Sequence, residues 1–196
     1  MGFLAFFQAL AGKHDVPTSA DPIAAVAPAA APVHGLDGAE VVRRALSCVG
    51  RGVYRLGKGG RRPHDPAPFD ASGASDCSGF ASWCLGLDRY QPTAIDGGWI
   101  STDSIVRDAR GPHRMFVEVP VNGDGGPWAM PGDLVVYPGR FVAGKRVGIG
   151  HVGVIVEPGP TILACRVAHC AASGKVAVRV SDGRPWSRRG IVARRE

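Results

Sequence analysis

The chain has 196 residues, which suits a single domain with a buried core plus a tail. Its formal net charge of +6 favours an anionic partner, but no nucleic-acid-binding motif accompanies the basic residues, so nucleic acid is not expected. The five cysteines are an odd number without a Cys-x-x-Cys pair, which argues against a disulfide framework and a zinc ribbon. The 28 glycines and 16 prolines predict many loops, and no metal or organic cofactor is implied.

The first part of the chain, residues 1–34, is expected to lie outside the folded domain. Residues 1–10 are apolar but lack the basic segment that opens a secretory signal, and they are too short to span a bilayer as a helix. We expect a short amphipathic or docking helix there, followed by a disordered linker rich in Ala and Pro over residues 15–33. The folded domain is then expected over residues 35–196.

The folded domain is predicted to open with a helix over residues 38–49. Asp37 can cap this helix, since a short acidic side chain at this position accepts a hydrogen bond from the free backbone amides. The apolar side chains recur at helical spacing and form one stripe, which indicates packing against a core: Val41, Val42, Ala45, Leu46 and Val49.

Cys77 is the candidate nucleophile. It lies in residues 76–80, Asp-Cys-Ser-Gly-Phe, after a segment rich in Pro and Gly and before apolar residues at helical spacing. This pattern predicts a helix that begins at or next to Cys77, where free backbone amides and the helix dipole favour a thiolate and could stabilise an oxyanion. The alternative is a buried structural cysteine, which is the commoner role for a lone thiol.

The middle of the chain carries weaker signals. A short helix is predicted over residues 104–109, with its cap among residues 101–103. Trp99 is expected in the core, because buried aromatic residues usually serve packing. Residues 57–60 are rich in glycine, but no Gly-Lys-Ser/Thr step follows, so nucleotide binding is not expected.

Two histidines complete a candidate catalytic set. Residues 150–156 predict a strand that begins near His151, and residues 161–169 predict a strand that ends at His169. A cysteine nucleophile needs a base that accepts its proton, and the base needs a group that orients it. The two histidines can fill these roles for Cys77, although a lone histidine on a strand is more often structural. The three residues together favour catalysis.

Three motifs together resemble the NlpC/P60 family of papain-like cysteine peptidases. They are Asp-Cys-Ser-Gly-Phe at residues 76–80, Pro-Gly-Asp-Leu-Val at 131–135 and Gly-His-Val-Gly-Val at 150–154, and the resemblance covers roughly residues 39–182. It implies an α+β papain-like fold, with N-terminal helices packed on an antiparallel sheet of about five strands. Members of this family mostly cleave stem peptides of bacterial peptidoglycan, often between D-glutamate and the diamino acid.

The resemblance also implies catalytic roles. Cys77 matches the nucleophile, His151 the base and His169 the polar third residue. His169 lies further beyond His151 than the third residue of the family usually does, so the orienting role stays open to another polar residue such as Asp182. We prefer His169, because the sequence around it resembles the family's strand that ends in His-Ala-Ser.

Substrate-binding roles follow from the same resemblance. Tyr54 matches the family's tyrosine before a glycine-rich loop and would lie near the thiol, and Asp76 and Ser78 would bind substrate beside it. Two segments are longer than the family usually carries. They are residues 60–75, before the cysteine, and residues 88–130, which are expected to contribute to the substrate cleft.

The implied activity is hydrolysis of an amide bond in a peptidoglycan stem peptide by a thiol peptidase, without a cofactor. One alternative is an acyltransferase or amidase of the same superfamily that acts on a lipid or another amide. Another is an antibacterial effector or phage lysin with the same chemistry. A wall-binding module without turnover is a further alternative, but the presence of both nucleophile and base argues against it.

The resemblance also bears on partners and location. Anionic cell-wall polymers are candidate partners for the basic surface. Action at the bacterial cell wall or in the periplasm is implied, although the export route stays open without a convincing signal, and cytoplasmic turnover of wall peptides is an alternative. The oligomeric state is not indicated.

Overall fold

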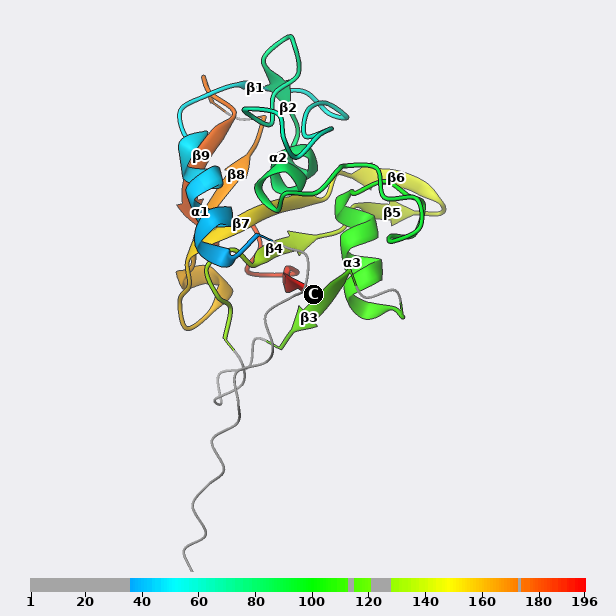
Figure 1. The fold of residues 1–196 in the computed structure, drawn as a ribbon. Coiled ribbons are helices and arrows are strands. Elements are labelled where there is room, and N and C mark those ends of the chain that lie inside the picture. Colours follow the sequence, from blue (N-terminus) through cyan, green and yellow to red (C-terminus); the bar gives the residue numbers. More distant parts are fainter. Residues whose placement is uncertain (1–35, 113–114, 121–127, 173) are drawn as a thin grey trace, which may run out of the picture. The chain divides into compact units, whose positions relative to one another are not determined.

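The computed structural model describes residues 36–112, 115–120, 128–172 and 174–196, and the helix and linker expected over residues 1–34 lie outside them. In the described part of the chain, three α-helices pack against a six-stranded antiparallel sheet, so the fold is α+β (Figure 1). No helix in this part is long and apolar enough to cross a membrane.

Helix α1 (Gly38–Ser47) begins as predicted. The side chain of Asp37 accepts a hydrogen bond of 2.7 Å from a backbone amide in the first turn, so it caps the helix. Val41 and Ala45 are buried, as expected for the core-facing side. The predicted stripe is wrong at Leu46 and Val49, which are both exposed, and the helix ends at Ser47 before it reaches Val49.

Helix α2 (Cys77–Cys84) begins at the cysteine, in agreement with the sequence pattern, and all of its residues are buried. Asp76 caps it, because its carboxylate accepts a hydrogen bond of 2.7 Å from the amide of Gly79. The helix packs on α1 and on the central strand β7 (His151–Glu157). The end of the helix that carries the thiol is therefore held by tertiary contacts as well as by its cap.

Helix α3 (Thr102–Arg110) starts earlier than predicted. Ser101 and Ser104 form a reciprocal capping box, each side chain accepting from the other residue's backbone amide. The turn before the helix leaves Trp99 37% exposed, so the expectation of a core residue is wrong. The ring of Trp99 lies instead against the guanidinium of Arg89, whose central carbon is 4.8 Å from the ring centroid. A cation in this position is attracted to the face of the aromatic ring.

The main sheet is antiparallel throughout the described residues, with its strands in the order β3, β10, β4, β7, β8, β9. Besides β7, the strands are β3 (Phe116–Val119), β4 (Leu134–Tyr137), β8 (Arg166–Cys170), β9 (Val178–Asp182) and β10 (Ile191–Arg195). Six strands stand where about five were expected, and the C-terminal strand β10 lies between β3 and β4.

Two small sheets accompany the main one in the described residues. Strands β5 (Arg140–Val142) and β6 (Lys145–Gly148) form an antiparallel hairpin. Strands β1 (Val53–Tyr54) and β2 (Ala74–Ser75) pair in parallel. Because β2 leads directly into the cap of α2, this pairing places Tyr54 beside the start of that helix.

The strand predicted over residues 161–169 is wrong in its first half. Thr161 caps a short 3-10 helix, η1 (Ile162–Ala164), through a hydrogen bond of 3.3 Å from a backbone amide of that helix to its hydroxyl. A hydroxyl that bonds the local backbone offers the chain an alternative to a sheet ladder. The strand begins at Arg166, and His169 lies on it as expected.

Apolar layers lie on both faces of the main sheet. Val152 and Val154 of β7 belong to the layer that also holds the helices, whereas Ile155 packs in the other layer with Trp186. Side chains alternate along a strand, so His151 shares a face with Ile155. The start of β7 therefore presents the imidazole on one side and the contact with α2 on the other.

Candidate active site

The thiol of Cys77 is buried in the first turn of α2. It is 3% exposed, and burial raises its pKa to about 11, with the negative charge of Asp76 acting in the same direction. Hydrogen bonds from the backbone amides of Val152 and Ser78 lower the pKa by smaller amounts. The net direction is opposite to that predicted from the helix terminus alone, because desolvation of the thiolate outweighs the two amides. The resting group is a neutral thiol.

His151 and His169 contact each other directly. Nε2 of His151 and Nδ1 of His169 are 2.8 Å apart, and the two rings meet edge-on with centroids 5.0 Å apart. Burial lowers the pKa of His151 to about 4 and that of His169 to about 3, and the positive charge of Arg179 acts in the same direction on both. Both imidazoles are therefore neutral at pH 7.

Ser181 extends the hydrogen-bonded line of the two histidines. Its oxygen lies 3.0 Å from the carbonyl oxygen of Asp182 and 3.1 Å from Nε2 of His169. When the hydroxyl donates to this carbonyl, its oxygen accepts from Nε2–H of His169. Nδ1 of His169 then has a lone pair, which accepts from Nε2–H of His151. This pattern leaves Nδ1 of His151 unprotonated, which is the form that a general base needs.

Trp186 packs against the histidine pair. Its ring stacks on His151, with centroids 5.2 Å apart and an interplanar angle of 15°, and it meets His169 edge-on at 5.2 Å. The indole N–H donates to the backbone carbonyl of His151 at 3.3 Å. Trp186 is fully buried, so these contacts limit rotation of both imidazoles. Neither Trp186 nor Ser181 was predicted from the sequence, because no motif marks either residue.

The start of β7 neighbours both the thiol and the imidazole. Val152, whose amide faces the sulfur of Cys77, directly follows His151. The described residues show no direct hydrogen bond between Cys77 and His151, and such catalytic hydrogen bonds are often long without substrate. Cys77 borders a pocket of about 220 Å³ and His151 one of about 430 Å³, here named the thiol-side pocket and the His-side pocket. Ile149 and Gly150 border both.

Tyr54 lies where the resemblance implied. Burial raises the pKa of its hydroxyl well above the ordinary value, and the neighbouring Cys77 and Asp76 add to this shift. A side-chain hydrogen bond with the Cys77 thiol is a further contribution in the same direction. Tyr54 also borders the His-side pocket. It therefore lies within reach of both the sulfur and a ligand beside the histidines.

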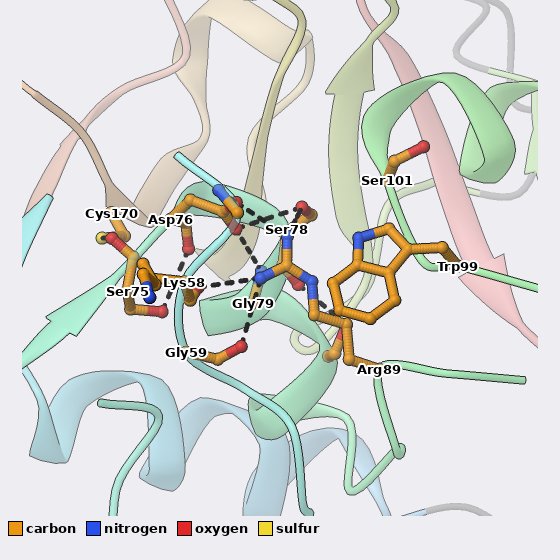
Figure 2. A network of polar contacts seen from close by, with 12 residues as sticks. Lys58, Gly59, Ser75, Asp76, Ser78, Gly79, Arg89, Trp99, Ser101 and Cys170 are labelled. Carbon is orange, nitrogen blue, oxygen red and sulfur yellow. Dashed lines mark hydrogen bonds and ion pairs between the residues drawn. The ribbon is translucent and has the colours of Figure 1, made fainter. Parts of the chain in front are cut away.

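A buried ion pair between Asp76 and Arg89 organises the thiol-side pocket (Figure 2). Oδ2 of Asp76 and Nη2 of Arg89 are 2.7 Å apart, and the two side chains are 2% and 3% exposed. The guanidinium also donates to the carbonyls of Lys58 and Gly59 and to the hydroxyl of Ser78. This network ties the glycine-rich loop to the first turn of α2.

The surroundings of Asp76 and Ser78 bear on their expected role in binding substrate. Both border the thiol-side pocket but are buried, 2% and 4% exposed. One carboxylate oxygen of Asp76 caps α2, and the other accepts from Arg89 and from the amide of Gly57. Their contact with substrate stays a prediction, whereas their part in holding the loop and helix together is evident. Arg89 was missed because its partner lies on another element.

The long segment over residues 88–130 does contribute to the thiol-side pocket. It supplies Arg89, Trp99, Ser101 and Thr102 to the pocket's wall. The ring of Trp99 stacks on the guanidinium of Arg89, which in turn pairs with Asp76. These residues line a pocket beside Cys77, and a role in binding substrate stays a prediction.

Asp182, the alternative orienting residue, lies apart from the histidine pair. It is exposed at the end of β9, and its carboxylate pairs with Arg184 at 3.3 Å. Because it directly follows Ser181, its side chain points to the other face of the strand. Among the described residues, His169 is the side chain that hydrogen-bonds the His151 ring.

In the described residues, no group of three or more His, Cys, Asp or Glu side chains could hold a metal ion. Comparison of the chain with family models, with curated proteins and with solved structures gave no match.

Proposed function

We propose that this protein is a cysteine peptidase with an NlpC/P60-like, papain-like domain that hydrolyses an amide bond in bacterial peptidoglycan stem peptides. The bond between D-glutamate and the diamino acid is the first candidate. One observation carries the proposal: Ser181, His169 and His151 form a hydrogen-bonded line, and the residue after His151 directs its backbone amide at the sulfur of Cys77. The order of helices and sheet along the chain agrees with the resemblance.

In the proposed reaction, Nδ1 of His151 accepts the thiol proton as the sulfur of Cys77 attacks the amide carbonyl. Burial keeps both groups neutral at rest, so proton transfer accompanies the attack. Backbone amides at the start of α2, with the hydroxyl of Tyr54 nearby, stabilise the oxyanion. The imidazolium then protonates the leaving amine. Water hydrolyses the thioester, which releases the carboxylic acid and restores the thiol.

The proposed setting is the bacterial cell wall or the periplasm. The formal net charge of +6 suits a wall that carries carboxylates and polymer phosphates, which are proposed as weaker, non-covalent partners. The same chemistry serves housekeeping hydrolysis, an effector or a phage lysin. The delivery route distinguishes these roles, and the site is common to all of them.

Digestion of purified peptidoglycan, followed by mass spectrometry of the released muropeptides, tests the proposal. The wild-type protein is expected to release stem-peptide fragments with a new amine and a new carboxyl end. Cys77→Ala should release none and still unfold cooperatively. Cys165→Ala is the matched control, since this buried cysteine lies in the apolar layer away from the helices.

Two results would overturn the proposal: no release by the wild-type protein, or full release by Cys77→Ala. A product in which the acyl group has moved to an amine or a lipid would favour the acyltransferase alternative instead.

A further inference from the structure

We propose that the His-side pocket binds a carboxylate on the leaving half of the substrate, and that Arg179 is the residue that recognises it. The inference rests on the proposed function and narrows its substrate class. Substrates would be amides whose departing amine belongs to an amino acid with a free carboxylate next to that amine.

The charge of the pocket is the first observation. Its volume of about 430 Å³ is large enough for an amino-acid residue. Arg179 borders it together with Tyr54, Tyr137 and the two histidines, and none of the described residues that line it is acidic. A second guanidinium, that of Arg189, lies over the ring of Tyr137 at 4.3 Å. The pocket therefore carries positive charge and suits an anion.

Strand pairing places Arg179 beside the catalytic histidines. Arg179 on β9 is directly opposite His169 on β8, and side chains at opposed positions share a face of the sheet. Ser181 lies on that same face and hydrogen-bonds His169. The positive charge of Arg179 also acts on the pKa values of both histidines, in keeping with its closeness.

The roles of Cys77 and His151 in the proposed reaction place the leaving half of the substrate in the His-side pocket. The acyl half becomes bonded to the sulfur of Cys77, which borders the thiol-side pocket. The imidazole of His151 protonates the departing amine, so this amine must lie next to the ring. An α-amino acid carries its carboxylate close to its amine. Arg179 can then bind the carboxylate through two parallel hydrogen bonds, which a guanidinium makes better than an ammonium.

Matched peptides test the inference. Stem tripeptides L-Ala-γ-D-Glu-X, with lysine or diaminopimelate as X, are offered with the α-carboxylate of X free or amidated. The wild-type protein should cleave the free acids with a kcat/KM about 10- to 100-fold higher, the range implied by loss of a charged hydrogen bond. Arg179→Gln should lose this preference, because its kcat/KM falls more on the acids than on the amides, and Arg179→Lys should keep part of the preference.

Arg166→Gln is the control, since it removes the same charge from an exposed position on β8 and should behave as wild type. Equal cleavage of acids and amides by the wild-type protein would overturn the inference. So would an Arg179→Gln variant that is slowed equally on both kinds of peptide.

A binding experiment separates this inference from the proposed function. If the wild-type protein cleaves none of the peptides, the proposed peptidase function is contradicted, and the binding experiment alone tests whether the pocket binds a carboxylate. Cys77→Ala protein is titrated with L-lysine and with L-lysinamide while the ring signals of His151 and His169 are followed by NMR. Lysine should shift these signals, and the added Arg179→Gln change should abolish the effect. No shift with lysine, or equal shifts with lysinamide, would contradict the site.

Discussion

Gly79, in the motif at residues 76–80, and Gly150, in the motif at residues 150–154, permit close backbone contact at the site. A Cβ on Gly79 would lie 2.7 Å from the carbonyl oxygen of Lys58 and 2.8 Å from that of Gly59. A Cβ on Gly150 would lie 2.2 Å from the hydroxyl of Thr102. These distances are shorter than side-chain carbons tolerate, so packing explains why the two positions hold glycine.

Gly79→Ala is expected to destabilise the protein. Alanine in a helix normally gains about 0.5–1 kcal/mol over glycine. Here the added methyl must displace the carbonyls that receive Arg89, and overpacking of this kind costs about 1–3 kcal/mol. Urea unfolding at pH 7 measures the sum. A more stable Gly79→Ala protein would contradict the close packing of the loop on α2.

Asp76→Asn should be far more damaging than Asp37→Asn, although both residues cap helices. Asparagine caps nearly as well as aspartate, so the cap itself is preserved in both variants. Asp76→Asn also leaves the buried guanidinium of Arg89 without its counter-charge, which typically costs about 3–5 kcal/mol. Urea unfolding of the two variants gives the difference. Similar losses would mean that the ion pair contributes little.

The thiol of Cys77 should react slowly with iodoacetamide at mildly acidic pH. Its pKa of about 11 in the free protein leaves little thiolate at pH 6, and the alkylation rate should keep rising as the pH approaches that value. Native labelling over a pH series, followed by peptide mapping, measures Cys77 separately from the other four cysteines. A plateau below pH 7 would instead indicate a preformed thiolate with an imidazolium.

At the scale of elements, three neighbouring strands align the polar groups of the site. Strand β7 carries His151, β8 carries His169 and β9 carries Ser181, and the register of β8 with β9 sets the last contact. The thiol comes from α2, which packs on the first two of these strands. A small shift in strand pairing would therefore displace His151 from its hydrogen-bond partners, whereas Cys77 on α2 would keep its position.

Variants along this line should form a graded series in kcat. His151→Ala should lose on the order of a hundredfold or more, because it removes the base. His169→Ala should lose less, with partial recovery in His169→Asn, whose amide can still bond the imidazole. Ser181→Ala should lose least, since it only frees the tautomer of His169.

Steady-state kinetics across a pH series measures the effects. A wild-type rate for His169→Ala together with a slow Asp182→Ala protein would mean that Asp182 is the orienting residue.

At the scale of the whole molecule, burial of two neutral histidines links stability to pH. The folded-state pKa values of His151 and His169, about 4 and about 3, lie below the ordinary value of 6.5. Between these values the unfolded chain binds more protons than the folded one. The stabilisation is therefore complete above pH 6.5 and is lost as the pH falls to about 4 for His151 and to about 3 for His169.

Urea unfolding at pH 7, 6 and 5 should show this loss, by up to about 1.4 kcal/mol per pH unit for each histidine that remains neutral in the fold. Most carboxylates titrate below this range, so they add little to the slope. His169→Asn should flatten it, because one titrating group is gone. A wild-type protein equally stable at pH 7 and pH 5 would contradict the buried neutral pair.

The local features of this protein could be predicted from its sequence. An aspartate before a helical apolar pattern predicted the start of α2 at Cys77, and β-branched residues predicted the strand that begins at His151. These signals act between residues close in the chain, where hydrogen-bonding geometry and side-chain shape suffice. The prediction failed at Thr161, where a hydrogen bond from the local backbone to its hydroxyl competes with strand pairing. It also failed at Trp99, whose ring packs against the guanidinium of Arg89 and not in the core.

Only the tertiary structure decided how the site is supported and charged. Arg89, Trp186 and Ser181 are far from their partners in the chain, and they meet them only through loop packing and strand register. The direction of the Cys77 pKa shift was likewise beyond the sequence. A helix terminus is a local property, but desolvation depends on every element that packs around the sulfur, and at this thiol it is the larger of the two effects.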